Sequence, residues 1–237
     1  MNDERCWAVV PAAGVGRRMG GNIPKQYLEL SGQPVLLQTL RRLASCPGIS
    51  GLFLGISAAD PYWQEIWQEI SLEAPLLKSV CDGGDERADT VSRILDDMKG
   101  MVQENDWVLV HDAVRPCISH TDIQQLMRLA SQHDGGLLGR PISDTVKLAD
   151  SRGRVKKTIA RDGLWGAQTP QMFRYGELRM ALRDAKKKGL VITDEASAME
   201  LAGFQPLMVQ GSSDNIKITV PGDLELAELF IQKQVAP

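Results

Sequence analysis

Short apolar runs alternate with segments of helical hydrophobic spacing along the first half of the chain. Each run of four to eight apolar residues between turn signals predicts a buried strand, and each i, i+3, i+4 pattern predicts a helix. The predicted strands are 6–11, 52–56, 76–81 and 107–110, and the predicted helices are 35–45, 63–70, 91–98 and 123–130. Repeated βα units indicate an α/β fold, with a doubly wound, mainly parallel sheet.

The pattern changes between Asp144 and Ile159, where Val146 and Val155 belong to apolar positions that alternate with polar ones around a turn at 150–153. This predicts a protruding β-hairpin. Too few large apolar residues flank it for a core of its own, and an isolated hairpin is marginal in water. We therefore expect residues 144–160 to be an arm that packs on another surface, for which a partner subunit is the economical candidate.

The rest of the chain returns to helical patterns. Residues 176–188 predict a helix, a second is expected between Thr193 and Gly203, and Pro221 is expected to open the last one. Lys217 is expected at the start of a strand. No linker or low-complexity run divides the chain, so residues 1–237 are expected to form one domain.

Charge and composition argue against several classes of function and limit the kinds of metal site that are expected. The net charge of −3 argues against general binding of nucleic acid or an anionic membrane, and no stretch resembles a signal peptide or a membrane span. A cytoplasmic protein is expected. The four cysteines lack C-x-x-C spacing and the three histidines are dispersed, so any metal is expected to bind to oxygen ligands.

A glycine-rich loop follows the first strand, with the sequence PAAGVGRRMG. Gly14 and Gly16 allow backbone N–H groups to approach a polyphosphate, while Arg18 and Lys25 supply positive charge. The spacing matches neither the dinucleotide fingerprint nor the P-loop. A plain glycine turn with surface cations is the alternative.

Two further loops carry polar residues after predicted strands. Asp112, in HDAVRP, follows the strand that ends at residue 110, where it can hold Mg²⁺, and Arg115 can bind a phosphate. The alternative is a turn cap paired with Arg115. In GGDERADT, Gly84 permits close approach to a flat base and Asp85 can accept from the exocyclic amine of cytosine. The alternative there is an acidic helix N-terminus.

Taken in order, these motifs closely resemble the 2-C-methyl-D-erythritol 4-phosphate cytidylyltransferases of the non-mevalonate isoprenoid pathway. The segments that carry the resemblance are PAAGVGRRM, PKQY, GGDERADTV, HDAVRP, ARDGLW, QTPQ, ITDEASAME and DNIKIT. The resemblance implies a Rossmann-like nucleotidyltransferase, Mg²⁺, a homodimer with embracing arms, and transfer of CMP from CTP to methylerythritol phosphate.

The same resemblance implies roles for individual residues. The catalytic pair is Arg18 and Lys25. The nucleotide-binding residues are Ala12, Ala13, Gly14, Gly16, Gly84, Asp85, Thr90 and Lys217. The substrate-binding residues are Asp112, Arg115, Thr145, Arg161 and Thr193, with Asp112 also on the side of the metal, and with Thr145 and Arg161 acting in the neighbour's site.

Two alternatives remain at the level of the sequence. Ribitol 5-phosphate cytidylyltransferase shares PKQ and HDAVRP, although ARDGLW and TDEA favour methylerythritol phosphate. A nucleotide-binding regulatory domain without catalysis is the other, and the presence of Arg18, Lys25 and Lys217 argues against it.

Overall fold

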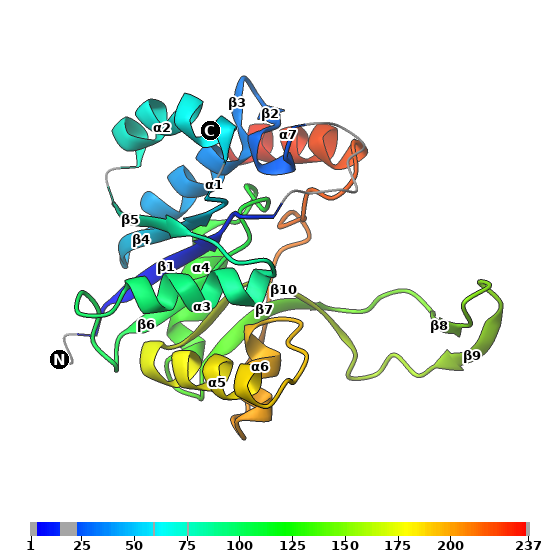
Figure 1. Cartoon of the computed structure of the whole chain (residues 1–237). Helices are drawn as coiled ribbons and strands as arrows, with labels where there is room; N and C mark the ends of the chain where they lie inside the picture. Colours follow the sequence, from blue (N-terminus) through cyan, green and yellow to red (C-terminus); the bar gives the residue numbers. More distant parts are fainter. Residues whose placement is uncertain (1–3, 15–22, 59, 75, 236–237) are drawn as a thin grey trace.

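The computed structural model of the chain describes residues 4–14, 23–58, 60–74 and 76–235. Its centre is a seven-stranded sheet in the order β11-β7-β10-β6-β1-β4-β5 (Figure 1). These strands are β1 (Cys6–Pro11), β4 (Ile49–Ile56), β5 (Leu77–Asp82), β6 (Trp107–Val110), β7 (Gly136–Pro141), β10 (Trp165–Arg174) and β11 (Leu207–Gln210). Only β10 is antiparallel to its neighbours β6 and β7. The predicted α/β fold with a mainly parallel, doubly wound sheet is therefore confirmed.

Helices cover both faces of this sheet (Figure 1). Helices α1 (Val35–Ala44), α2 (Pro61–Glu73) and α4 (His120–Ala130) pack into one hydrophobic cluster, and α3 (Arg87–Asp97), α5 (Tyr175–Lys187) and α6 (Glu195–Leu201) pack into the other. A short 3₁₀ helix, η2 (Lys25–Tyr27), and the small hairpin of β2 (Glu29–Leu30) and β3 (Gln33–Pro34) follow the glycine loop. Helix α7 (Gly222–Val235) packs beside this hairpin through a third cluster. None of the described helices is long and apolar enough to cross a membrane.

Strand β1 shows why the first apolar run is continuous. Ala8 and Val10 belong to the cluster on one face, while Trp7 and Val9 belong to the cluster on the other, and all four are buried. A strand that is covered on both faces has no polar side to alternate with the apolar one.

The topology opens a crevice beside β1. Strand β1 pairs with β4 on one side and with β6 on the other. After β1 the chain first adds β4 and β5 on one side, and only later forms β6 on the opposite side, so the direction of strand addition reverses at β1. Ligands of open α/β sheets bind at such a switch point, beyond the carboxyl ends of the strands. The loops after β1, β5 and β6 all open on that edge.

The predicted hairpin is present as an arm that projects away from the sheet (Figure 1). Its strands are β8 (Val146–Ala149) and β9 (Val155–Ile159), which pair with each other in a separate antiparallel sheet. Most arm residues are exposed, including the apolar Leu148 and Val155. The turn uses Gly153 at positive φ, a conformation that glycine adopts without steric cost.

One sequence expectation needs correction, and part of the sheet was not expected. The segment around Lys217 is not a strand: Ile218 N–H bonds to the Val114 carbonyl, but residues 214–219 form no ladder. Strands β7, β10 and β11 were not expected. Only the order of the sheet shows that β10 enters between β6 and β7, and hydrophobic periodicity does not contain that order.

Candidate active site

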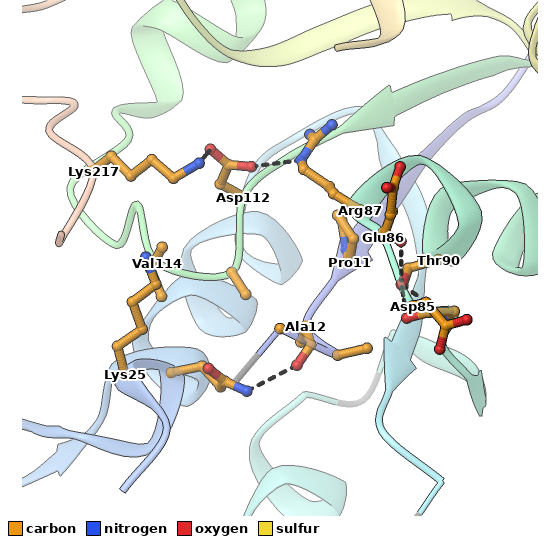
Figure 2. A pocket seen from close by; sticks show the side chains of 15 residues that line it. Pro11, Ala12, Lys25, Asp85, Glu86, Arg87, Thr90, Asp112, Val114 and Lys217 are labelled. Atoms are coloured by element: carbon orange, nitrogen blue, oxygen red, sulfur yellow. Dashed lines mark hydrogen bonds and ion pairs between the residues drawn. The ribbon is translucent and has the colours of Figure 1, made fainter. Parts of the chain in front are cut away.

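A cleft of about 150 Å³ lies at the carboxyl ends of β1, β5 and β6 (Figure 2). The described residues that line it come from three strand-end loops, the segment at η2 and the loop before α7. They are Pro11, Ala12, Ala13, Gly14, Lys25, Gln26, Gly84, Asp85, Glu86, Arg87, Thr90, Asp112, Ala113, Val114 and Lys217. The structure thus gathers most of the predicted nucleotide-binding residues, together with Lys25 and Asp112, in one place.

The loop after β1 is tied down at Ala12. Its N–H donates to the Gly55 carbonyl at 2.7 Å, and its own carbonyl accepts from Nε2 of buried Gln26 at 2.9 Å (Figure 2). Lys25 precedes Gln26, and its Nζ lies 3.4 Å from the Ile218 carbonyl. The ammonium group is thereby held at the cleft from the side opposite the β5 loop. The predicted residues Gly16 and Arg18 lie outside the described residues.

The loop after β5 forms the opposite wall. Gly84 N–H donates to Thr90 Oγ1 at 3.0 Å, so this buried hydroxyl fixes the turn. A Cβ on Gly83 would collide with Ala13 and stand 3.0 Å from Thr90 Oγ1, which explains why a glycine is required at that close approach. Asp85 stands exposed at the rim of the cleft.

Asp112 lies within a cluster of charged side chains at the cleft. Its Oδ1 accepts from Arg87 Nε at 3.0 Å, and its Oδ2 lies 3.0 Å from Lys217 Nζ (Figure 2). The same Oδ2 lies 3.2 Å from Arg115 Nε. Burial alone would raise the pKa of Asp112, but the positive charges of Arg87, Lys217 and Arg115 outweigh it and hold the pKa well below its usual range. Asp112 is therefore an ionised acceptor at neutral pH.

A buried network holds the backbone of this loop. Asp112 N–H donates to Thr169 Oγ1 at 3.0 Å, and the same hydroxyl lies 3.1 Å from His111 Nδ1. His111 Nε2 is 3.0 Å from the Arg115 carbonyl. Burial lowers the pKa of His111 to about 4, so the imidazole is neutral and serves the packing of the loop.

Arg87 and Glu195 were not predicted from the sequence. Arg87 lines the cleft and makes a two-pronged ion pair with Glu195, which is 1% exposed. The two residues are 108 positions apart, so no local spacing indicates their contact. The one signal available was the TDEA helix start, which places an acidic residue in the first turn.

The predicted substrate residues are placed in three different settings. Arg115 is tied to Asp112 and to the Asn215 carbonyl at 2.7 Å. Thr193 is exposed just before α6. Thr145 and Arg161 lie at the base of the arm, where Arg161 donates to the Ser143 carbonyl. None of the described residues lining the cleft belongs to the arm.

The described residues do not by themselves fit a metal site. They contain no group of three potential His, Cys, Asp or Glu ligands. Both oxygens of Asp112 already face cations, and a divalent ion there would meet three positive charges. Mg²⁺ commonly binds through one or two carboxylates plus substrate phosphates, so phosphate oxygens would have to supply most of its ligands here.

Comparison with known proteins decides the family. The model of the 2-C-methyl-D-erythritol 4-phosphate cytidylyltransferase family matches residues 6–233. The chain belongs to this family. A curated family member from Hahella chejuensis is 50% identical over 234 residues, covering 98% of this chain and 95% of its own, and one from Vibrio vulnificus strain YJ016 is 45% identical, covering 96% and 94%.

Solved structures agree with the family assignment. The Francisella tularensis 2-C-methyl-D-erythritol 4-phosphate cytidylyltransferase superposes with a TM-score of 0.82 at 36% identity, covering 96% of this chain and 100% of that one. A structure described as 4-diphosphocytidyl-2C-methyl-D-erythritol synthase gives a TM-score of 0.83 at 33% identity, covering 97% and 100%. The resemblance seen in the sequence motifs is therefore confirmed at the level of family and fold.

Proposed function

We propose that the chain transfers CMP from CTP to 2-C-methyl-D-erythritol 4-phosphate, giving 4-diphosphocytidyl-2-C-methyl-D-erythritol and pyrophosphate for isoprenoid precursor synthesis. The observation that carries this proposal is the cleft itself, in a chain that matches the family over residues 6–233. The cleft brings together the turn at Gly84, which can approach a flat base, the two lysines Lys25 and Lys217, and the acid Asp112, which is proposed to bind substrate. All of them lie at the switch point of the sheet.

The chemistry needs positioning and positive charge more than proton transfer. An oxygen of the alcohol phosphate attacks the α-phosphorus of CTP, and the bond from that phosphorus to the pyrophosphate oxygen breaks. Because the attacking oxygen is already ionised, no general base is required, and a buried neutral His111 is compatible with turnover. Lys25, Lys217 and the glycine-loop residue Arg18 would stabilise the negative charge of the transition state.

Asp112 is proposed to bind the alcohol phosphate through its hydroxyl groups. A carboxylate offers about four lone-pair positions, and Arg87, Arg115 and Lys217 occupy three of them. Movement of the Lys217 ammonium to a bound phosphate would release a further acceptor for a hydroxyl. The substrate role therefore suits Asp112 better than direct metal ligation, and we propose that Mg²⁺ enters with the triphosphate.

The arm is proposed to complete the site of a second copy. It carries more cations than carboxylates although the chain has a net charge of −3, and its apolar Val155 is 63% exposed. An exposed two-stranded hairpin of this kind needs a surface to pack on. A homodimer would deliver Thr145 and Arg161 to a cleft that the described arm residues do not line in their own chain.

The four cysteines are free thiols, which supports a reducing cytoplasmic location.

Base selectivity gives one prediction. The enzyme is expected to prefer CTP over UTP by about 10² in kcat/KM, because the Asp85 carboxylate accepts from the cytosine amine and repels the uracil carbonyl. Asp85→Asn is expected to reduce that preference by about tenfold, since an amide can also donate. Asp82→Asn, at the end of β5 and exposed outside the cleft, is the matched control. Equal specificity constants for CTP and UTP in the parent enzyme would remove this role of Asp85.

Pyrophosphate release from CTP, measured separately with methylerythritol phosphate and with ribitol 5-phosphate, tests the proposed function. Release only with the former supports it. Release only with ribitol 5-phosphate favours the alternative cytidylyltransferase, and CTP binding without release under either condition favours a regulatory domain.

A further inference from the structure

A buried carboxylate behind the cleft is connected to its central acid through one guanidinium group. Glu195 Oε1 is 2.7 Å from Arg87 Nη1, and Oε2 is 3.1 Å from Arg87 Nη2. The remaining nitrogen of the group, Nε, donates to Asp112 Oδ1 at 3.0 Å. Arg87 therefore links Glu195 to Asp112, so the position of Glu195 affects how Arg87 contacts Asp112. Glu195 itself is not among the described residues that line the cleft.

Glu195 itself is firmly placed. It is the first residue of α6, directly after the N-cap Asp194, whose side chain takes part in a capping box. Gln171, 1% exposed on β10, donates to Asp194 Oδ2 at 2.8 Å and accepts from Ala196 N at 2.8 Å. Both neighbours of Glu195 in the chain are therefore fixed to the central sheet.

Stability alone is a weak explanation for this ion pair, in which the Glu195 side chain is 1% exposed and the Arg87 side chain is 29% exposed. Replacing a buried ion pair with apolar side chains of similar volume is often neutral or stabilising, so such a pair is weak evidence for a folding role. What the two-pronged pair does provide is direction, because a planar guanidinium bound at both Nη atoms has its Nε–H vector fixed. That vector points at Asp112 Oδ1.

We propose that Glu195 is a positioning residue, which holds Arg87 so that Asp112 presents its free lone pairs to the hydroxyl groups of the alcohol phosphate. The proposal rests on the proposed function for the identity of that substrate. Without the Glu195 charge, the Arg87 fork turns toward Asp112 and occupies the lone pairs that the substrate needs. Binding of the alcohol phosphate weakens, whereas CTP, which contacts the other walls, is affected less.

Glu195→Gln keeps the size of the side chain and removes its charge. It is expected to raise KM for the alcohol phosphate by about tenfold, since small misplacements of a binding group are costly, and to change KM for CTP by less than about twofold. Glu200→Gln, at an exposed position of the same helix, is the matched control and is expected to behave as the parent. Circular dichroism of each variant establishes that the assays are made on folded protein.

A double variant separates positioning from a general structural effect. If Glu195 acts through Arg87, adding Glu195→Gln to Arg87→Gln changes KM for the alcohol phosphate by less than about twofold. An unchanged KM in folded Glu195→Gln would overturn the proposal. So would an equal rise in the Arg87→Gln background, or a fall in kcat with both KM values unchanged.

An activity-independent measurement distinguishes failure of this proposal from failure of the proposed function. The ¹H–¹⁵N resonance of Arg87 Nε, assigned by its loss in Arg87→Gln, is expected to shift or broaden in Glu195→Gln and to remain in place in Glu200→Gln. If the parent shows no cytidylyl transfer, the proposed function fails while this signal still decides whether Glu195 orients Arg87. An unmoved resonance in Glu195→Gln contradicts the positioning role.

Discussion

Replacing Lys25 with alanine is expected to lower kcat by about 10² or more, because a cation placed at the reacting phosphate acts mainly on the transition state. That factor corresponds to about 2.7 kcal/mol of lost transition-state stabilisation. Lys25 is half-buried at the cleft, with Nζ near the Ile218 carbonyl, and no cluster of the hydrophobic core includes it. The fold is therefore expected to survive the change.

Steady-state kinetics with saturating CTP and Mg²⁺ measures this effect. Arg18→Ala is expected to show a loss of the same order. Lys233→Ala, on the exposed side of α7, is the matched loss of a lysine outside the cleft and is expected to leave kcat unchanged. Wild-type turnover by either Lys25→Ala or Arg18→Ala would show that the assigned catalytic role is wrong.

Arg18→Ala and Arg161→Ala each remove a residue of the proposed site, so each is expected to be inactive alone, and the two are expected to restore each other's activity when mixed. If the arm of one chain serves the cleft of the other, a heterodimer of Arg18→Ala with Arg161→Ala has one site with both lesions and one with neither. Random mixing gives about half heterodimers, each with one intact site of two, so activity returns to roughly a quarter of the parent's. Refolding the two variants together and measuring pyrophosphate release gives the result.

The matched control mixes Arg18→Ala with Lys25→Ala. If Arg18 and Lys25 both serve the cleft of their own chain, as proposed, every site in that mixture carries a lesion and no recovery is expected. Recovery in the control would show that the assay does not report site sharing. Absence of recovery in the first mixture, with heterodimers confirmed by mass, would contradict the shared site.

The sequence predicted most of the architecture because the strands of a sheet covered on both faces are continuous apolar runs. The run at β6 was found with its observed bounds, and the arm was recognised from the change to alternation between Val146 and Ile159. Strand β7 was missed because Gly136 and Gly139 interrupt its apolar character. Strand β10 was missed because its partners, β6 and β7, are defined only by the tertiary structure.

The residues of the candidate site that could be predicted are those with a local sequence signal, and those that depend on tertiary contacts were missed. Residues at strand ends, such as Asp112 and Gly84, were recognised because parallel strands deliver their following loops to one edge. The Arg87–Glu195 pair was not, because it joins α3 to α6 through the tertiary structure alone. The assignment of Lys217 to a strand was wrong, yet its ammonium lies at the cleft, 3.0 Å from Asp112 Oδ2. A side chain's place in the site is therefore less dependent on its secondary structure than on which loop carries it.

The central claim is that this cleft joins CMP to methylerythritol phosphate. Phosphorus-31 NMR of the purified protein with CTP, Mg²⁺ and an equimolar mixture of methylerythritol phosphate and ribitol 5-phosphate tests it most directly, because both alcohol phosphates compete for one site. The account predicts loss of the methylerythritol phosphate signal, with equal growth of free pyrophosphate and of a diphosphate diester. Ribitol 5-phosphate is expected to remain. Consumption of ribitol 5-phosphate in preference, or an unchanged spectrum with folded protein, would contradict the account.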